Sequence, residues 1–363
     1  MTAQQNKSIA LAVALLGLIL TIAGPLLPGG ERLERNSPAY TGHVTDLAGG
    51  GTDPKDAQSQ PLLAGTSAGE VWRYQDGLWQ HLPLDFGGHP ITTIIGDPAK
   101  HPVGTGAGLY NPPPGTQFSE RVGDLMQTPL GLVIGNDRGI HLLAPEGNQL
   151  LNAGMNVYRF IRQNNQGQTY LHAGTVGAGV HSTTVEAMGN DWPANNQGLP
   201  RDAYVYSFAV TEGGKLIAGT KSGLFWQSRP GDTWQPLDAE HGKTRVLALY
   251  LAPATQDRPQ HLWIGTDGHL LHVDLIETAD ALKVASTATA VHQSEGALPY
   301  GISWIRPVPN GVMISAGAVY QWGPVRLPGW YWISISGIVL LLIAGWMLPG
   351  REENPDSSTA TPE

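Results

Sequence analysis

The sequence predicts an all-β protein, a seven-bladed β-propeller flanked by two transmembrane α-helices. Three observations predict it: an uncharged apolar segment near each end, a strand–turn–strand motif that recurs seven times between them, and an unusual composition. Among 363 residues there are 47 Gly and 28 Pro, and only 14% are charged. Helical bundles and coiled coils need more Ala, Glu, Lys and Leu than this. An apolar share of 41% with 11 Trp disfavours disorder.

Charge and cysteine content exclude several classes of function. The net charge is −9, which disfavours a general nucleic-acid-binding surface. The chain has no cysteine, and this excludes disulfides, thiolate metal sites, iron–sulfur clusters and cysteine nucleophiles.

The first apolar segment follows an N-terminal tail at 1–7. Residues 8–28 carry no charge and are long enough to cross the hydrocarbon core of a bilayer. We expect them to form transmembrane helix 1, an uncleaved signal anchor. The alternative is a signal peptide cleaved after Ala23. The anchor is favoured because Pro25–Leu27 prolongs the apolar run beyond an ordinary signal-peptide core.

The second apolar segment, at 329–348, is also uncharged. Aromatic residues at 330–332 mark one end and Trp346 lies near the other, as in the aromatic belts of membrane helices. We expect transmembrane helix 2 here, the alternative being a buried core helix. The acidic, polar tail at 349–363 is expected to be disordered.

Two spans place both termini on one side of the membrane and everything between them on the other. Lysine and arginine residues do not decide the orientation, because three positive charges flank the helices on each side. From the signal anchor we expect a two-pass membrane protein with cytoplasmic termini and the propeller on the extracytoplasmic or periplasmic side.

Between the two spans, a tether at 29–37 leads into one large domain at 38–328. In this domain a short apolar strand ending in Gly-Thr, a turn of small residues and a second short strand recur. The spacing averages about 42 residues, the length of a four-stranded propeller blade. The copies are LLAGTSAGEVWRY (62–74), PVGTGAGLYN (102–111), LVIGNDRGIHLL (132–143), LHAGTVGAGVHST (171–183), LIAGTKSGLFWQS (216–228), LWIGTDGHLLHV (262–273) and VMISAGAVYQW (312–322).

Each motif is the centre of one predicted blade. Its glycines and small residues are expected to supply the positive φ angles of a tight hairpin. An apolar stretch before the motif, such as ITTIIGD (91–97), suits the inner strand. A Trp-bearing segment after several motifs, such as DGLWQHLPL (76–84), suits the outer strand. The outer strand of the last blade is either GPVRL (323–327) or a segment that follows the tether. A pair of open β-sandwiches is the rival fold, and it predicts no common period.

The repeat resembles the propellers of the sialidase-type (Asp-box) and two-component-regulator repeat superfamily. The best example is residues 198–237, where Leu-x-x-Gly-Thr-x-x-Gly-Leu-Phe is followed by a turn and Trp. In their general sequence pattern the blades are similar to photosystem II assembly-factor propellers and to ligand-binding propellers of sorting receptors. A regular Asp box is Ser-x-Asp-x-Gly-x-x-Trp; here Ser228, Gly231, Asp232 and Trp234 keep the residue types in altered spacing. The resemblance therefore implies fold more than function.

A glycan hydrolase of the sialidase type would need three converging arginines, a Tyr–Glu pair and an acid–base Asp. Arg306, in WIRP (304–307), is faintly similar to the arginine motif of such enzymes, but it lies in the last blade instead of near the first. We expect it to be a strand residue paired with a carboxylate.

Other candidate chemistry also favours structural roles. His141 and His181 occupy the column held by aromatic residues in other copies, and His269 and His272 lack metal-ligand spacing. The Gly-Thr-x-x-Gly turns lack the Lys and the helix of a phosphate loop, and GTGAG (104–108) precedes no helix. We therefore nominate no catalytic, cofactor-binding or metal residues, and expect no cofactor.

The function expected first is a non-catalytic scaffold: an accessory subunit or assembly factor of a larger membrane complex. Its expected partners are integral membrane proteins and the lipid bilayer, with no nucleic acid. The alternative is an extracytoplasmic ligand-binding or sensory propeller for a sugar or peptide, and a glycan hydrolase comes third. Aromatic or acidic groups in the central tunnel would favour a ligand, whereas an apolar patch on one face would favour docking.

Overall fold

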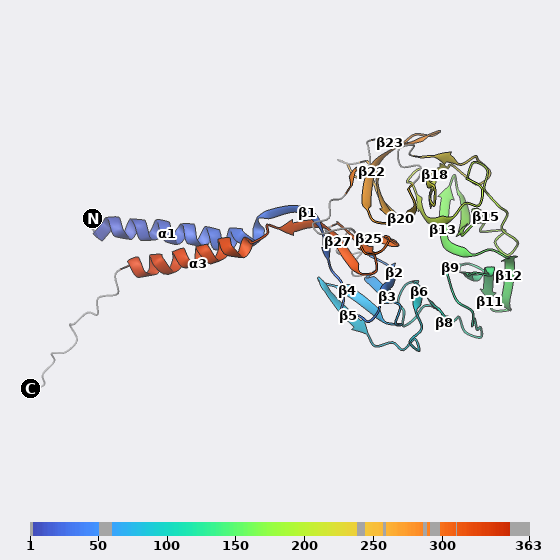
Figure 1. The fold of residues 1–363 in the computed structure, drawn as a ribbon, viewed down its shortest axis with the longest axis horizontal. Coiled ribbons are helices and arrows are strands. Elements are labelled where there is room, and N and C mark those ends of the chain that lie inside the picture. The colour runs from blue at the N-terminus through green and yellow to red at the C-terminus, as the bar shows by residue number, and fades with distance from the viewer. Residues whose placement is uncertain are drawn as a thin grey trace, which may run out of the picture. The chain divides into compact units, whose positions relative to one another are not determined.

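The fold is the expected all-β propeller. A computed structural model describes residues 3–50, 60–237, 244–256, 259–285, 289–290, 298–309 and 311–348. The strands in these ranges form seven antiparallel sheets, which follow one another around a ring (Figure 1). Blade 1 starts at β2 and blade 7 ends at β27. The seven-fold repeat of the sequence therefore corresponds to seven blades.

The first four blades contain three or four strands each. Blade 1 is β2 (Val44–Ala48), β3 (Leu62–Thr66), β4 (Val71–Gln75) and β5 (Leu78–Leu82). Blade 2 is β6 (Ile91–Ile94), β7 (Val103–Thr105) and β8 (Gly108–Tyr110). Blade 3 is β9 (Asp124–Thr128), β10 (Gly131–Gly135), β11 (Gly139–Ala144) and β12 (Gly147–Ala153). Blade 4 is β13 (Val157–Asn165), β14 (Gln168–Thr175) and β15 (Val180–Thr184).

The last three blades complete the ring. Blade 5 is β16 (Val205–Val210), β17 (Leu216–Thr220), β18 (Gly223–Gln227) and β19 (Gln235–Pro236). Blade 6 is β20 (Val246–Ala252), β21 (His261–Thr266), β22 (Leu270–Glu277), β23 (Leu282–Val284) and β24 (Thr289–Ala290). Blade 7 is β25 (Trp304–Val308), β26 (Gly311–Ser315), β27 (Val319–Arg326) and β1 (Pro28–Arg35).

The hydrophobic core lies between blades. In the described part of the chain, buried apolar residues form seven clusters, and each cluster joins two neighbouring blades. Between blades 3 and 4, for example, Val133 and Leu142 pack with Leu171 and with the fully buried Trp192. A blade alone would expose both faces of its sheet, so its burial depends on the blade on either side.

The two glycines of the repeat have different roles, and this corrects the expectation that both serve the hairpin. In blades 1 and 5 the second glycine, Gly69 or Gly223, has a positive φ angle in the turn, whereas Gly268 in blade 6 does not. The first glycine lies within a strand and has no positive φ. A Cβ atom on Gly65 would lie 2.5 Å from Ile91 of the next blade, and one on Gly135 would lie 2.4 Å from Val157. The first glycine thus lets the next inner strand pack closely.

The threonine of Gly-Thr holds the hairpin. The Oγ1 hydroxyl of Thr105 donates to the carbonyl of Gly108 at 2.9 Å, and that of Thr220 donates to the carbonyl of Gly223 at 2.8 Å. The Thr266 hydroxyl likewise donates to the His269 carbonyl at 3.0 Å. Because these hydroxyls are buried, each would lack a hydrogen-bond partner without the carbonyl group in its own hairpin.

The ring closes with a strand from the N-terminal side of the domain. β1 falls largely within the segment expected to be a tether, and it pairs with β27 as the fourth strand of blade 7. The next residues join blade 7 to blade 1. The Asn36 amide donates to Gln321 Oε1 at 2.9 Å, and the Trp79 indole donates to the Asn36 carbonyl at 3.0 Å. Most of GPVRL (323–327) belongs to β27, the third strand of blade 7. The outer strand is therefore neither GPVRL nor a segment after the tether, but β1.

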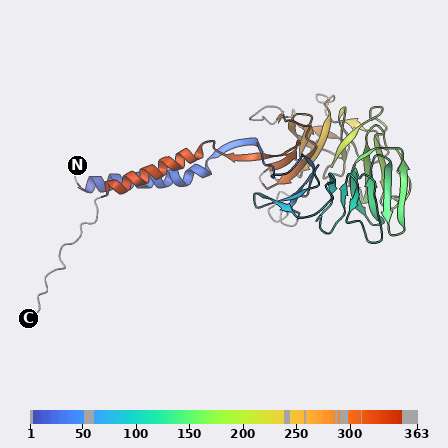
Figure 2. The same ribbon diagram turned by 60° about the horizontal axis from the view of Figure 1, so that its bottom comes forward.

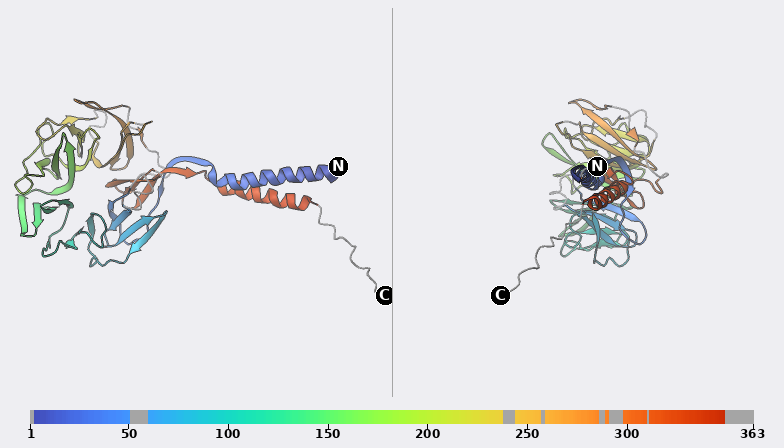
Figure 3. Two further views of the ribbon diagram at one scale, coloured as in Figure 1. Left: turned by 180° about the vertical axis from the view of Figure 1, so that it is seen from behind. Right: turned by 90° about the vertical axis from the view of Figure 1, so that its left-hand side faces the viewer.

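The helices α1 (Ala3–Ala23) and α3 (Trp330–Met347) lie side by side (Figures 2 and 3). A short 3₁₀ helix, η1 (Gly24–Leu26), follows α1. Both helices are long and apolar enough to span a membrane. They meet along small residues: a Cβ on Gly337 would lie 2.5 Å from the Gly17 carbonyl, and Ser334 Oγ donates to the Thr21 carbonyl at 3.1 Å.

Large apolar side chains face outward from the helix pair. Trp346 is 89% exposed and Leu342 is 70% exposed. A core helix of a soluble protein would bury such residues, so this alternative for 329–348 is disfavoured. The tail expected to be disordered, 349–363, lies outside the described residues.

Candidate functional site

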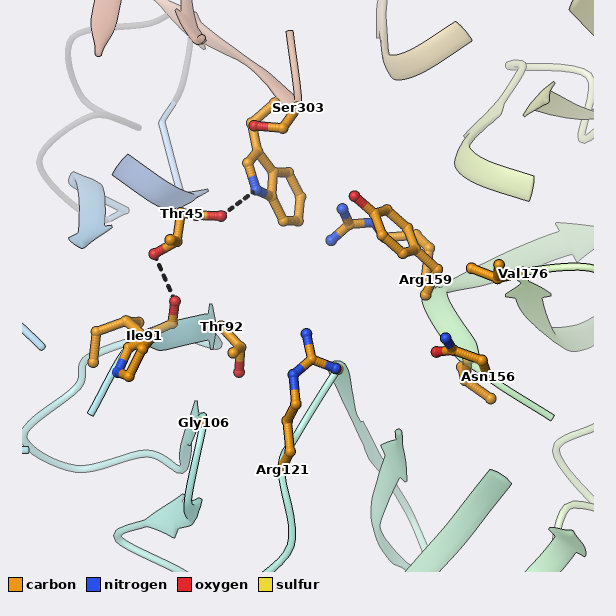
Figure 4. A pocket seen from close by; sticks show the side chains of 14 residues that line it. Thr45, Ile91, Thr92, Gly106, Arg121, Asn156, Arg159, Val176 and Ser303 are labelled. Atoms are coloured by element: carbon orange, nitrogen blue, oxygen red, sulfur yellow. Dashed lines mark hydrogen bonds between the residues drawn. The ribbon is translucent and has the colours of Figure 1, made fainter. Parts of the chain in front are cut away.

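A cavity of about 430 Å³ lies where inner strands of blades 1, 2, 4 and 7 approach one another, at the centre of the ring (Figure 4). Strands β2, β6, β13 and β25 contribute to it, together with residues that precede β9. The lining residues are Thr45, Pro90, Ile91, Thr92, Gly106, Arg121, Gly123, Asn156, Val157, Tyr158, Arg159, Val176, Ser303 and Trp304.

The inner strands share a local irregularity at one position, and in two of the blades the residue at this position, Arg159 or Trp304, lines the cavity. In five of the described blades the register shifts between the first and third residues of the inner strand, as between Val44 and Asp46 or between Val157 and Arg159. Such a bulge turns the strand where it approaches the axis. The equivalent third residues around the ring are Asp46, Thr93, Asp124, Arg159, Ser207, Ala248 and Trp304.

Arg159 lies over an aromatic ring at the cavity wall. Its guanidinium carbon is 3.6 Å from the centroid of Trp304 and 5.4 Å from that of Tyr158. The Trp304 indole is fixed by a hydrogen bond to the Thr45 carbonyl at 3.2 Å. The contact orients the guanidinium through cation–π attraction and leaves its N–H donors available.

Arg306 lies on the same tryptophan, 4.4 Å from the ring centroid. Its Nη1 donates to the Ile305 carbonyl at 3.2 Å. Burial lowers the pKa of Arg306 to about 10, although the nearby carboxyl of Asp46 acts in the opposite direction. The expected pairing with a carboxylate is therefore wrong in detail: Asp46 and Asp124 are near enough to interact electrostatically, but among the described residues no ion pair within 4.0 Å involves Arg306.

The two carboxyl groups near the axis are engaged with backbone. Asp46 Oδ2 accepts from the Ile94 amide at 2.8 Å, and Asp124 Oδ2 accepts from the Phe160 amide at 2.7 Å. Thr93 also donates to Asp124, at 3.2 Å. Burial raises the pKa of Asp46 to about 7, against the opposing influence of Arg306 and Arg159. Each carboxyl group joins its blade to the next, and neither lines the cavity.

Several polar groups on the cavity wall have no partner. Arg121 and Arg159 extend into the cavity from two different blades (Figure 4). Within the described ranges, the Arg121 side chain makes no hydrogen bond or ion pair, and neither does the Asn156 amide. The Thr92 hydroxyl also has no hydrogen-bond partner, but it is buried beside Gly104 and is not accessible from the cavity. The unused donors of Arg121, Arg159 and Asn156 give the cavity capacity to bind a ligand.

The cavity is positively charged in an acidic protein. Of the described residues that line it, two are arginines and none is Asp, Glu or His. The whole chain carries a net charge of −9. A concave site of one charge sign concentrates ligands of the opposite sign. The arrangement can orient a bound molecule, but the lining holds no carboxyl or imidazole group for acid–base chemistry.

No site residue was predicted from the sequence, and neither Arg121 nor Arg159 was singled out there. A signal for Arg159 is present. In blades 2 to 7 a Val or Ile packs against the first glycine of the repeat in the blade before it. When the inner strands are aligned on this Val or Ile, or on its counterpart in blade 1, Arg159 occupies the same position as Asp46 and Asp124. Arg121 precedes such a residue, Val122, and would be found in the same way.

His141 and His181 lie in blade strands. His141 pairs with Ile134 and packs on Phe118, and His181 Nδ1 donates to the Trp192 carbonyl at 2.9 Å. His272 lies in β22 with its ring next to Trp263, whereas His269 lies in the turn before β22. No group of three His, Asp or Glu residues able to hold a metal occurs among the residues described. Residues 104–108 connect β7 to β8, as expected for a hairpin.

A second cavity, of about 580 Å³, lies by blades 1 and 2 and is lined by residues that include Arg73 and Asp97. It is bordered by Gly49 and Gln60, and the residues between Gly50 and Gln60 are outside the described part of the chain. The central cavity is therefore the better-defined candidate, although it is smaller.

Comparison with known proteins shows the fold. No protein-family model matches the chain, and no curated protein matches it. Among solved structures, the extracellular domain of the putative hybrid two-component system BT4673 from B. thetaiotaomicron is similar, with TM-score 0.61 and 14% identity over 81% of this chain and 40% of that one. The corresponding domain of BT3049 gives TM-score 0.54 and 13% identity over 81% and 42%. A chain of the Mitotic Checkpoint Complex gives TM-score 0.56 and 14% identity over 82% and 92%.

The chain thus matches about two fifths of the length of the two extracellular domains. At these identities the likeness concerns the propeller fold. The class that fold and cavity define is a seven-bladed propeller with two helices long and apolar enough to span a membrane.

Proposed function

We propose that this chain is a membrane-anchored, non-catalytic propeller that binds a ligand in its central cavity. The observation that carries the proposal is the cavity wall, where Arg121 and Arg159 face an open space of about 430 Å³ with unused hydrogen-bond donors. Ligand pockets of proteins have this size and this small number of convergent polar groups.

Binding without catalysis is supported by the chemistry of the wall. Its described polar side chains are guanidinium, amide, hydroxyl and phenol groups together with one indole. General acid–base catalysis near neutral pH is most often carried out by His, Asp or Glu. These residues are not among the described lining residues, so the wall is better suited to recognition.

An extracytoplasmic location of the propeller belongs to the same proposal. Two terminal helices of membrane-spanning length support membrane attachment. Two of the similar structures are described as extracellular domains of two-component systems, which supports placing this ring outside the cytoplasm.

The test is ligand-induced stabilisation of the full-length protein in nanodiscs of neutral lipid. A panel of small sugars, organic acids and phosphate esters is screened by thermal unfolding. A ligand at 100 times its Kd should stabilise the folded state by about 2.7 kcal/mol. Thr92→Phe, which places a bulky ring in the cavity, should abolish the shift, and Arg201→Ser, an exposed control elsewhere, should leave it unchanged. Absence of any shift, or a shift that Thr92→Phe does not change, would contradict ligand binding in the cavity.

A second candidate function is that of an accessory subunit or assembly factor that binds integral membrane proteins. The observation that favours it is the outward surface of the helix pair. Trp332 and Leu342 are exposed by 63% and 70%. Membrane helices associate through packing of such surfaces as well as through small residues.

This candidate is tested by purification in mild detergent from native membranes. We expect integral membrane proteins in fixed stoichiometry with the tagged chain. Their recovery should fall when Trp332 and Leu342 are replaced by Ala, while Arg201→Ser retains them. A chain that purifies alone would contradict this second function and leave the ligand proposal in place.

A further inference from the structure

We propose that the central cavity selects small hydroxylated oxyanions, that is, a carboxylate or phosphate ester carried on a sugar-like molecule. This inference rests on the proposed ligand-binding function and names the chemical class of its ligand. It concerns the described lining residues, with Arg121 and Arg159 as the groups that recognise the anion.

The first argument concerns charge. Two guanidinium groups enter the cavity, and the described wall contains no carboxylate to neutralise them. Arg159 lies over an aromatic ring at 3.6 Å, a contact that leaves its N–H donors free. The planar guanidinium matches the geometry of carboxylates and phosphates and forms charge-assisted hydrogen bonds with both. A neutral ligand would leave the two charges unpaired.

The second argument concerns what the molecule carries besides the anion. The Asn156 amide faces the cavity (Figure 4), and the Ser303 side chain also lines it. A hydroxyl and an amide each donate and accept, which suits the hydroxyl groups of a sugar. An ammonium group would find no carboxylate on the described wall, so free amino acids are disfavoured. The exposed ring of Tyr158 offers a flat surface for a pyranose.

The third argument concerns size. The cavity of about 430 Å³ is at the lower end of the range for small-molecule pockets. The space is lined by blades 1, 2, 4 and 7 and by the segment before β9, so a small molecule would be contacted from several sides. An acidic peptide segment from another protein would have to thread into this space, and for that reason we favour the small molecule.

The experiment is calorimetric titration of the full-length protein in neutral-lipid nanodiscs at low ionic strength. The probes are glucuronate, glucose 6-phosphate, glucose, inorganic phosphate and a poly-glutamate peptide. We expect glucuronate or glucose 6-phosphate to bind at least 10-fold more tightly than glucose and inorganic phosphate. Comparison of the first two shows which oxyanion the site takes.

The variants locate the site. Arg121→Ser should weaken binding of the preferred probe by about 10- to 100-fold, the usual effect of losing a hydrogen bond to a charged group. Because Arg121 is exposed and its side chain makes no hydrogen bond or ion pair among the described residues, its replacement should have little effect on folding. Arg159→Lys keeps the charge and loses the planar fork, so a loss intermediate between Arg121→Ser and the unchanged protein is expected. Arg201→Ser is the matched control and should bind as the unchanged protein does.

The outcomes separate this inference from the proposed function. Glucose binding as tightly as the acids, in a manner that Thr92→Phe abolishes, would overturn the anion class and retain the ligand-binding function. Inorganic phosphate as tight as glucose 6-phosphate would overturn the sugar-like part. Binding of poly-glutamate alone would overturn the small-molecule class, and binding of no probe, with no hit in the thermal screen, would overturn both proposals.

Discussion

At the scale of single residues, the first glycine of the repeat lies where a β-branched residue of the next blade packs. Gly65, Gly135 and Gly265 illustrate this, because a Cβ on each would lie within 2.4 to 2.6 Å of a Val or Ile side chain of the neighbouring blade. Those contacts involve atoms close to the backbone, which cannot move freely. Recurrence of this glycine is therefore a consequence of ring packing.

Blade 6 offers a matched pair of substitutions that tests this account. In Gly265→Ala the new methyl group would lie 2.6 Å from Ile302 Cγ2, and we expect a loss of about 1–3 kcal/mol in the free energy of unfolding, as for other overpacked sites. Gly268, three residues later in the same motif, has open space around its Cα and no positive φ, so Gly268→Ala should be nearly neutral. Chemical denaturation measures both. Equal losses in the two variants would refute the packing role.

Asp46 predicts a pH dependence of stability. Its pKa in the folded protein is raised from 3.8 to about 7 by burial, with Arg306 and Arg159 acting against the rise and Asp124 adding to it. The folded state therefore holds a proton that the unfolded state releases between these values. The stabilising contribution is complete below pH 3.8 and is lost as pH rises to about 7.

We therefore expect the Tm to be a few degrees lower at pH 8 than at pH 5.5, and Asp46→Asn to reduce this difference. The amide oxygen can still accept from the Ile94 amide, so the link to blade 2 is kept. Asp76→Asn, at an exposed turn, is the control and should keep the pH dependence. A Tm difference unaffected by Asp46→Asn would contradict the assignment.

At the scale of elements, polar links fasten neighbouring blades beside their apolar contacts. Lys215, before β17 of blade 5, is 3% exposed and lies 3.2 Å from Glu277 at the end of β22 in blade 6. Glu277 also accepts from Thr211 at 2.7 Å and from Gln260 at 2.9 Å. Burial opposes the charge of Glu277, but these hydrogen bonds hold its pKa below the usual value.

Removal of one partner should be costly, because it leaves a buried charge without compensation. We expect Lys215→Met to lower the free energy of unfolding by about 3 kcal/mol or more. The double variant Lys215→Met/Glu277→Gln should recover part of this loss. The control is Arg245→Met, which breaks an ion pair with Asp267 whose side chains are about half exposed and should cost less than about 1 kcal/mol. Equal losses at the two sites, measured by urea unfolding, would argue against a blade-to-blade link.

At the scale of the whole molecule, ring closure and membrane attachment use adjacent segments of the chain. β1 follows α1 and η1 and supplies the outer strand of blade 7, while β27 of the same blade precedes α3. Both ends of the ring therefore lead to a helix of membrane-spanning length. Two spans require the N- and C-terminal segments to share one side of the membrane.

The absence of cysteine makes the topology directly measurable. With Arg201→Cys in the ring and Thr2→Cys before α1, a membrane-impermeant maleimide applied to intact cells should label the first and reach the second only after permeabilisation. The reverse pattern would place the propeller in the cytoplasm. Loss of an N-terminal tag from the mature protein would show that helix 1 is a cleaved signal peptide.

The number of blades could be predicted from the sequence alone, and so could the inner and central strands and the two apolar helices. These features depend on local patterns, namely alternating apolar residues, turn glycines and long uncharged runs. Such patterns can be detected in the sequence without knowledge of the fold. The expected inner strand at 91–97 corresponds to β6, and the expected outer strand at 76–84 corresponds to β5. The role of the first glycine was misjudged, because the side chain that excludes its Cβ belongs to another blade.

The folded structure was needed to show how the ring closes, what Arg306 contacts and which side chains share the central cavity. Arg121 and Arg159 come from segments before β9 and in β13, and Trp304 comes from β25 of the last blade. Their proximity follows from the curvature of seven packed sheets, each of which turns the chain slightly about one axis. A pattern of neighbouring residues in the sequence does not report this cumulative rotation of the chain. The candidate site can therefore be recognised only in the complete ring.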